Sequence, residues 1–236
     1  MQIDNNTYYV SEIFESIQGE GNFSGVYCLF VRFHFCNLSC TWCDTKYTWT
    51  EKSGHFSKYS SDELKEIISN SKCFHIIFTG GEPTFYRLDK LFVTNKKFHI
   101  ETNGTLIPIE KIEIEMKDGT IANRDAMDKN IIDHFNWVVS PKLSNSRQEF
   151  NENSMKFWAK QDYNIFKFII KSIIDIEEIE NLLMKFNIER QKVYLGIEGS
   201  TLKSQLQPEL VESILKAGFN FSPRLHIMLW GKRRRK

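Results

Sequence analysis

The chain has 236 residues, with 31 basic and 30 acidic side chains and a formal net charge of +1. This balance excludes a global attraction to nucleic acid, and an aromatic content of 14% excludes a disordered chain. The length suits one domain, no apolar run approaches the ~20 residues of a membrane span, and the N-terminus lacks the pattern of a signal peptide, so we expect a cytoplasmic protein.

The first predicted element is a strand over residues 8–17, which ends in the tetrapeptide Gln-Gly-Glu-Gly at 18–21. Two glycines around a carboxylate form a tight loop that brings the backbone and Glu20 close to a ligand. The next predicted strand, residues 27–35, carries Arg32. An arginine inside an apolar strand needs a partner, so it meets either an internal acid or an anionic ligand.

Three cysteines follow that strand at the spacing C-x-x-x-C-x-x-C, namely Cys36, Cys40 and Cys43. Thiolates prefer soft metals, so this spacing indicates a metal site. Structural zinc sites use four ligands, and so do ferredoxin-type clusters. Three thiolates on a 4Fe–4S cluster leave one iron open, and S-adenosylmethionine can fill that position. A Cys3His zinc site completed by His34 remains an alternative.

The remaining cysteines, Cys28 and Cys73, lie in apolar runs and are expected to be small buried hydrophobes. A capping box at residues 60–63 predicts a helix, and an apolar run at 73–78 predicts a strand buried on both faces. The strand leads into Thr-Gly-Gly-Glu-Pro at 79–83, where the di-glycine allows close backbone approach to a ligand.

The second half of the chain continues the alternation. Further strands are predicted at 97–102, 135–139, 163–170, 193–197 and 225–229, with a surface hairpin or excursion at 109–117. Helices are predicted after a cap at Asp175 and from Pro208 to Gly218. The basic tail, residues 232–236, is either a solvated terminus or a contact for an anion or RNA.

Strands that alternate with helices indicate a parallel sheet with right-handed crossovers. The unusual loops all follow strands, and in barrels of this type the active site lies at that end. We therefore predict an α/β fold, a partial, splayed and trimmed TIM-like barrel. Residues 1–236 are expected to form a single core domain with an N-terminal substrate loop and a basic C-terminal tail.

The cysteine spacing, together with Gly-Gly-Glu-Pro at 80–83, resembles the radical S-adenosylmethionine (SAM) superfamily. Five further segments resemble the 7-carboxy-7-deazaguanine synthase family over nearly the whole chain: residues 16–21, 40–47, 101–104, 139–142, and Leu-His at 225–226 with Trp-Gly at 230–231. The resemblance implies a ring contraction of 6-carboxy-5,6,7,8-tetrahydropterin to 7-carboxy-7-deazaguanine with loss of ammonia, in the biosynthesis of queuosine and related 7-deazapurines.

The resemblance also implies roles for individual residues. It implies that Cys36, Cys40 and Cys43 bind the 4Fe–4S cluster and that Thr45 binds Mg²⁺. SAM is assigned to Trp42, Asp44, Gly81, Glu82, Ser140 and Lys142. The pterin is assigned to Ile17, Gln18, Gly19, Glu20, Arg32 and Thr79, with Arg32 meeting its carboxylate. One position departs from the family: Arg224 stands where a glutamine often precedes Leu-His.

Two other functions are compatible with parts of the sequence. A glycyl-radical-enzyme activase has a similar size and cysteine motif, but the Gln-Gly-Glu-Gly loop argues against it. A zinc- or cluster-bearing RNA-binding module would use the basic tail, yet the net charge gives no broad basic face. By resemblance we expect a flavodoxin or ferredoxin as reductant, a homodimer, and no membrane or direct nucleic-acid partner.

Overall fold

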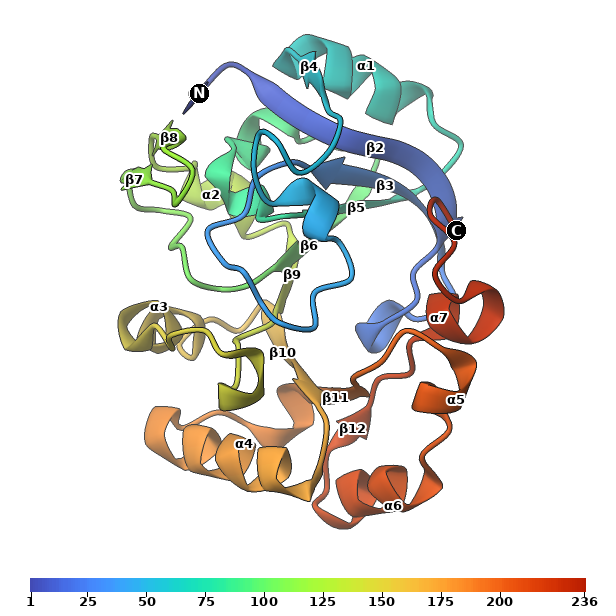
Figure 1. The fold of residues 1–236 in the computed structure, drawn as a ribbon. Coiled ribbons are helices and arrows are strands. Elements are labelled where there is room, and N and C mark those ends of the chain that lie inside the picture. Colours follow the sequence, from blue (N-terminus) through green and yellow to red (C-terminus); the bar gives the residue numbers. More distant parts are fainter.

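The computed structural model describes residues 1–236 and contains one sheet of nine strands (Figure 1). In spatial order these strands are β12 (Asn220–Phe221), β11 (Val193–Ile197), β10 (Asn164–Ile170), β9 (Asn136–Val139), β6 (Lys97–Thr102), β5 (His75–Gly80), β3 (Tyr27–Phe33), β2 (Tyr8–Ile17) and β4 (Ser57–Tyr59). The strands from β12 to β3 run parallel, whereas β2 and β4 join antiparallel at one edge. Because β12 and β4 do not pair, the sheet stays open, which confirms the predicted partial barrel.

Seven α-helices connect or follow the strands, and Figure 1 shows them around the periphery of the sheet. They are α1 (Ser61–Asn70), α2 (Lys129–Ile132), α3 (Glu152–Trp158), α4 (Ile173–Phe186), α5 (Leu202–Gln205), α6 (Pro208–Lys216) and α7 (Leu225–Trp230). The capping box of α1 is present, with Ser60 as its N-cap. The N-cap of α4 is Ser172 rather than the predicted Asp175, whose carboxylate instead accepts from the Ser172 amide at 3.0 Å.

A second, three-stranded sheet consists of β1 (Gln2–Ile3), β8 (Ile121–Arg124) and β7 (Ile112–Glu115). Strands β7 and β8 pair antiparallel across a turn at Asp118–Gly119, which confirms the predicted hairpin. Parallel strand β1 ties this hairpin to the start of the chain.

The parallel strands are buried on both faces, as their nearly continuous apolar sequences require. Cys28 and Cys73 are completely buried and unpaired in this core, which confirms their predicted role as small hydrophobes. No helix is long and apolar enough to cross a membrane.

The prediction of a final strand at 225–229 is wrong, because these residues form α7. A short apolar run fits either a strand or a buried helical turn, so periodicity alone does not decide between them. Tertiary contacts decide it here. The sheet edge beside β11 is already taken by β12, and the Leu225 amide donates to the Gly19 carbonyl at 2.9 Å. Ile227 then packs inward while Leu229 faces solvent.

Candidate active site

A cavity of about 590 Å³ lies at the carboxyl ends of the parallel strands, where the sequence places the ligand-binding loops. Its wall includes every sequence-predicted site residue except one. These residues are Ile17, Gln18, Gly19, Glu20, Arg32, Cys36, Cys40, Trp42, Cys43, Asp44, Thr45, Thr79, Gly81, Ser140 and Lys142. The exception is Glu82, which does not line the cavity.

The three cysteines of the predicted cluster motif reach this cavity from the loop after β3. The loop is fixed by backbone hydrogen bonds, including one from Cys36 to the Trp49 carbonyl at 3.1 Å and one from Cys43 to the Cys40 carbonyl at 3.1 Å. The Leu38 amide donates to the Cys36 sulfur at 3.4 Å. Burial raises the pKa of the Cys36 and Cys40 thiols, so their thiolates need a nearby cation. Three cysteine thiols line this one cavity, which fits an iron–sulfur cluster, whose irons supply such a charge.

The alternative zinc ligand, His34, is engaged elsewhere. Its Nδ1 lies 2.8 Å from the Ser11 hydroxyl and its Nε2 lies 2.7 Å from the Thr50 carbonyl oxygen. The side chain is completely buried. With both ring nitrogens in hydrogen bonds, His34 has no nitrogen left for a metal, so the Cys3His zinc site loses its fourth ligand.

Gly80 and Gly81, at the end of β5, allow the backbone to pack tightly against the backbone at the end of β3. A Cβ atom on Gly80 would lie 2.1 Å from the Phe33 carbonyl oxygen, and one on Gly81 would lie 2.0 Å from that of Phe35. Both distances are far below van der Waals contact, so only glycine fits. The Glu82 amide also donates to the Phe35 carbonyl at 2.7 Å. The di-glycine turn therefore supports the start of the cysteine loop.

The Glu82 carboxylate holds its own loop together. It is completely buried, and it accepts from the Thr84 amide at 3.0 Å, the Thr102 hydroxyl at 2.7 Å and the Asn103 amide at 2.7 Å. These donors come from the turn after β5, from the last residue of β6 and from the residue that follows it. The Glu82 carboxylate is thus held by these donors, and it does not line the cavity.

The end of β9 meets the cysteine loop through a polar cluster. Lys142 Nζ donates to the Ser140 hydroxyl at 3.0 Å and lies 5.4 Å from the centre of the Trp42 ring. The Trp42 indole donates to Asn145 Oδ1 at 3.0 Å. Lys142 thus contacts two other predicted SAM-binding residues, its near neighbour Ser140 and the distant Trp42.

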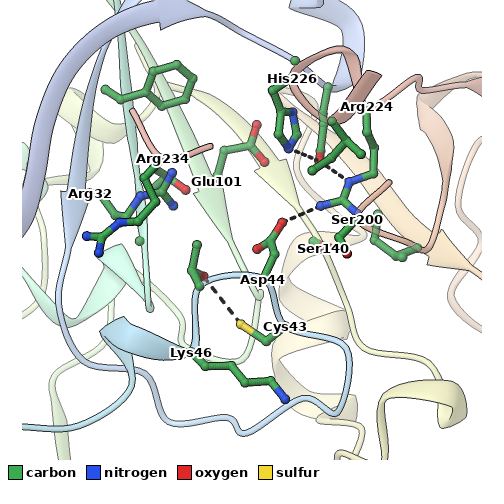
Figure 2. Close-up of a pocket in the computed structure, with 18 of the residues that line it drawn as sticks. Arg32, Cys43, Asp44, Lys46, Glu101, Ser140, Ser200, Arg224, His226 and Arg234 are labelled. Atoms are coloured by element: carbon green, nitrogen blue, oxygen red, sulfur yellow. Dashed lines mark hydrogen bonds and ion pairs between the residues drawn. The ribbon is translucent and has the colours of Figure 1, made fainter. Parts of the chain in front are cut away.

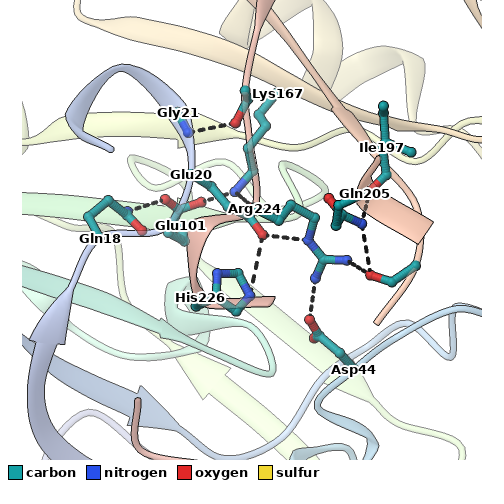
Figure 3. A network of polar contacts seen from close by, with 12 residues as sticks. Gln18, Glu20, Gly21, Asp44, Glu101, Lys167, Ile197, Gln205, Arg224 and His226 are labelled. Atoms are coloured by element: carbon teal, nitrogen blue, oxygen red, sulfur yellow. Dashed lines mark hydrogen bonds and ion pairs between the residues drawn. The ribbon is translucent and has the colours of Figure 1, made fainter. Parts of the chain in front are cut away.

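The Gln-Gly-Glu-Gly loop is joined to β10 by a network of ion pairs and hydrogen bonds (Figure 3). Lys167 on β10 lies between two carboxylates, 2.7 Å from Glu20 and 2.6 Å from Glu101. Gln18 donates to the other Glu101 oxygen at 2.8 Å. Burial alone would raise the pKa of Glu20, but Lys167 and Arg224 outweigh it and hold this pKa well below its usual range. Glu20 is therefore an ionised acceptor in the cavity wall.

Arg224 joins the substrate loop to the cysteine loop. Its Nε donates to Glu20 at 2.8 Å, its Nη1 donates to the Gly199 carbonyl at 2.7 Å, and its Nη2 donates to Asp44 (Figure 3). Next to it, His226 packs so closely on Gly19 that a Cβ there would lie 2.2 Å from the ring. The start of α7 thus clamps the Gln-Gly-Glu-Gly loop.

Arg32 meets an internal acid within the cavity wall. Its Nε donates to Glu12 on β2 at 3.1 Å, and Figure 2 shows its guanidinium at the cavity. The terminal nitrogens, Nη1 and Nη2, make no hydrogen bond in the structure. The sequence left two partners open for Arg32, an internal acid and an anionic ligand. The side chain can serve both, because Glu12 accepts from Nε while Nη1 and Nη2, the fork of the guanidinium, stay free for an anion.

Several cavity residues were missed by the sequence analysis: Glu12, Tyr47, Glu101, Lys167 and Arg234. A signal existed for Lys167, because it interrupts an apolar strand and a buried lysine needs a counter-charge. For Arg234 the run of five basic residues at 232–236 already indicated a possible anion contact, whereas for Glu12 no local signal exists, since its partner Arg234 comes from the other end of the chain.

Comparisons with known proteins show what the chain is similar to. Residues 30–122 match the model of the radical SAM superfamily. The chain is similar to a 7-carboxy-7-deazaguanine synthase of Pyrobaculum aerophilum, with 30% identity covering 96% of each chain. The enzyme of that name from Escherichia coli is 27% identical over 93% of this chain and 96% of its own.

Solved structures show the same fold. The crystal structure of QueE from Escherichia coli superposes with a TM-score of 0.66 at 24% identity, covering 93% of this chain and 95% of that one. Streptococcus suis SuiB matches with a TM-score of 0.51 at 15% identity over 80% of this chain and 46% of its own.

Proposed function

The chain belongs to the 7-carboxy-7-deazaguanine synthase family of radical SAM enzymes, and we propose that it converts 6-carboxy-5,6,7,8-tetrahydropterin into 7-carboxy-7-deazaguanine. The six-membered tetrahydropyrazine ring contracts to a pyrrole, and one ring nitrogen leaves as ammonia. The observation that carries this proposal is that the cysteine loop, the di-glycine turn and the Gln-Gly-Glu-Gly loop line one cavity.

The cavity has residues for each group that the reaction needs. Cys36, Cys40 and Cys43 would hold a 4Fe–4S cluster, which would supply, with bound SAM, the one-electron chemistry that starts the reaction. Gly81 and the Trp42–Lys142 pair form the wall that receives SAM, with Ser140 and Asp44 beside them.

Glu20 orients the pterin. It is ionised, and a carboxylate accepts two parallel N–H bonds from the amino edge of a pterin ring. Lys167 and Arg224 hold this carboxylate in place, while Gln18, with the backbone of Ile17 and Gly19, completes that side of the cavity. Thr79, at the end of β5, and the free fork of Arg32 face the same cavity and receive the rest of the substrate.

Thr45 is the proposed Mg²⁺ ligand. Its hydroxyl lies 3.5 Å from the Cys43 sulfur and lines the cavity. Mg²⁺ commonly takes one or two protein oxygens and completes its octahedron from substrate and water, so a single hydroxyl beside the substrate is sufficient.

Three further proposals concern assembly. We infer that residues 1–236 act as one catalytic domain, because both ends of the chain contribute to the cavity. A homodimer is supported by exposed Leu202, Leu206 and Leu229 on α5, on the turn after it and on α7, and sedimentation of the purified protein tests it. A flavodoxin or ferredoxin is the proposed electron donor, and replacement of a chemical reductant by each donor tests that.

The function is tested with anaerobically reconstituted protein, SAM, reductant and 6-carboxy-5,6,7,8-tetrahydropterin. Mass spectrometry should detect 7-carboxy-7-deazaguanine and 5′-deoxyadenosine, and a reaction without the pterin is the control. A Cys36→Ala variant should yield neither product and retain little iron. Formation of a glycyl radical on a partner protein, without turnover of the pterin, would instead identify an activase.

A further inference from the structure

Glu12 is a buried carboxylate at the cavity wall. Its side chain is 1% exposed and lies on β2, far in sequence from most of its partners. Oε2 accepts from Arg32 Nε at 3.1 Å and from the Tyr47 hydroxyl at 2.8 Å, while Oε1 accepts from Arg234 Nε at 3.0 Å. Burial alone would raise the pKa of Glu12, but the Tyr47 hydroxyl and the two guanidinium groups outweigh it and lower this pKa. Glu12 is therefore ionised and anchors two arginines.

The basic tail folds back to the rim of the cavity, where its side chains remain exposed to solvent. The Arg234 guanidinium carbon lies 3.9 Å from the centre of the Tyr47 ring, a cation–π contact, and Arg235 Nε lies 3.5 Å from Glu12. Figure 2 shows Arg32 and Arg234 side by side. The Glu12 carboxylate thus forms ion pairs with guanidinium groups from β3 and from the last residues of the chain.

The charges around Glu12 do not balance. One negative carboxylate faces the positive charges of Arg32, Arg234 and Arg235, which leaves an excess of two positive charges. Like charges held together at a cavity wall favour an anionic ligand between them, because the ligand removes their mutual repulsion.

The network around Glu20 has the opposite sign. There the carboxylates of Glu20, Glu101 and Asp44 face only Lys167 and Arg224, which leaves one negative charge in excess. The cavity is therefore polarised between a negative and a positive group. The proposed substrate has the matching polarity, with the N–H-rich pyrimidine edge at one end and the carboxylate at the other.

We propose that Arg234 and Arg32 form a twin-arginine site, organised by Glu12, that receives the carboxylate of the substrate. Arg32 offers its free fork, and Arg234 adds a second cation from the tail. The tail thereby becomes a specificity determinant for a carboxylated pterin. This inference rests on the proposed function and extends it to a residue outside the motifs of the family.

The test compares Arg234→Ala with Arg233→Ala, which removes the same charge from the neighbouring residue, whose side chain makes no ion pair in the structure. Binding of 6-carboxy-5,6,7,8-tetrahydropterin and of 5,6,7,8-tetrahydropterin, which lacks the carboxylate, is measured on anaerobically reconstituted enzyme. Arg234→Ala should weaken binding of the carboxylated pterin about tenfold and leave that of the analogue unchanged, because one charge-assisted contact is lost. Arg233→Ala should bind both ligands like the wild type.

Arg234→Lys supplies a second variant, since it keeps the charge without the planar fork, and its affinity should lie between those of the wild type and Arg234→Ala. Melting temperatures verify that each variant is folded. Equal affinities of Arg234→Ala and Arg233→Ala for the carboxylated pterin would overturn the twin-arginine site. Tighter binding of this pterin by Arg234→Ala would also overturn it, because the tail would then block the cavity. Absence of pterin binding and turnover in the wild type would instead overturn the proposed function.

Discussion

Arg224 and Glu20 are 204 positions apart in the sequence, yet Arg224 Nε donates to Glu20 Oε1 at 2.8 Å. Arg224 also donates to Asp44, so one guanidinium contacts both the loop proposed for the pterin and the loop proposed for SAM. Both Arg224 and Glu20 are largely buried, which makes this ion pair less sensitive to solvent screening than a surface pair. The position of one loop therefore depends on that of the other.

Replacement of Arg224 tests this coupling. Arg224→Gln keeps a polar side chain but removes the ion pairs with Glu20 and Asp44. We expect kcat/KM for the pterin to fall roughly ten- to a hundredfold, because a charge-assisted hydrogen bond contributes about 1.5–3 kcal/mol. Iron content should stay at the wild-type value, since Arg224 contacts no cysteine. Unchanged kinetics with both substrates would show that the two loops are not coupled through this side chain.

Lys167 is expected to set the pH dependence of stability. Lys167 and Arg224 hold the pKa of Glu20 below the ordinary value of 4.5. A carboxylate with a lowered folded pKa contributes stability that is present above its unfolded pKa and is lost as the pH falls through the folded pKa. Lys167→Met should therefore lower the free energy of unfolding by about 3 kcal/mol at pH 7, because the buried Glu20 carboxylate loses one of its two main cationic partners.

The same reasoning predicts that the wild type and Lys167→Met approach each other in free energy of unfolding as the pH falls below about 5. Urea unfolding between pH 4 and pH 8 measures it, with Lys216→Met as the control, because Lys216 is exposed on α6 and forms no ion pair. A difference that stays constant with pH would contradict an electrostatic role for Lys167.

Gly81 is expected to be irreplaceable for the cysteine loop. A Cβ at this position would lie 2.0 Å from the Phe35 carbonyl oxygen and 3.1 Å from the Cys36 amide, both backbone atoms that cannot rotate away. Gly81→Ala should cost about 3 kcal/mol and lower the iron content after reconstitution. Gly119→Ala is the matched control, because a Cβ there meets nothing within 4 Å. It should cost about 1–2 kcal/mol through its positive φ alone and leave iron binding intact.

Thr45→Ala separates Mg²⁺ binding from cluster binding. The Thr45 hydroxyl is a hard oxygen ligand, whereas the thiolates bind the soft iron cluster. We expect iron content to be unchanged, while the Mg²⁺ concentration for half-maximal turnover rises severalfold. Titration of turnover with Mg²⁺ measures this value. Thr48→Ala is not a suitable control, because the Thr48 hydroxyl donates to the Thr45 carbonyl and so stabilises the same turn. A Thr45→Ser variant, which keeps the hydroxyl, should respond to Mg²⁺ like the wild type. Identical titrations for wild type and Thr45→Ala would remove Thr45 from the site.

Local features of the chain were predictable from the sequence. The cysteine spacing, the di-glycine turn after β5 and the capping box of α1 each depend on residues a few positions apart, and the structure contains all three. The alternation of strands and helices likewise indicated the parallel sheet, because apolar runs and caps reflect local backbone preferences. The assignment of the cavity wall to the loops after the strands followed from that topology.

Only the tertiary structure decided which charges meet. Glu12 and Arg234 look like ordinary polar residues in the sequence, and their pairing depends on the tail folding back to β2. Glu82 has its place in the motif, while the tertiary structure supplies hydrogen-bond donors to its carboxylate from Thr102 and Asn103, at the end of β6. The final helix α7 likewise owes its form to its contact with Gly19. Local spacing sets which groups can bind a ligand, whereas the curvature of the sheet sets which distant charges become neighbours, and buried charges must find such partners to be stable.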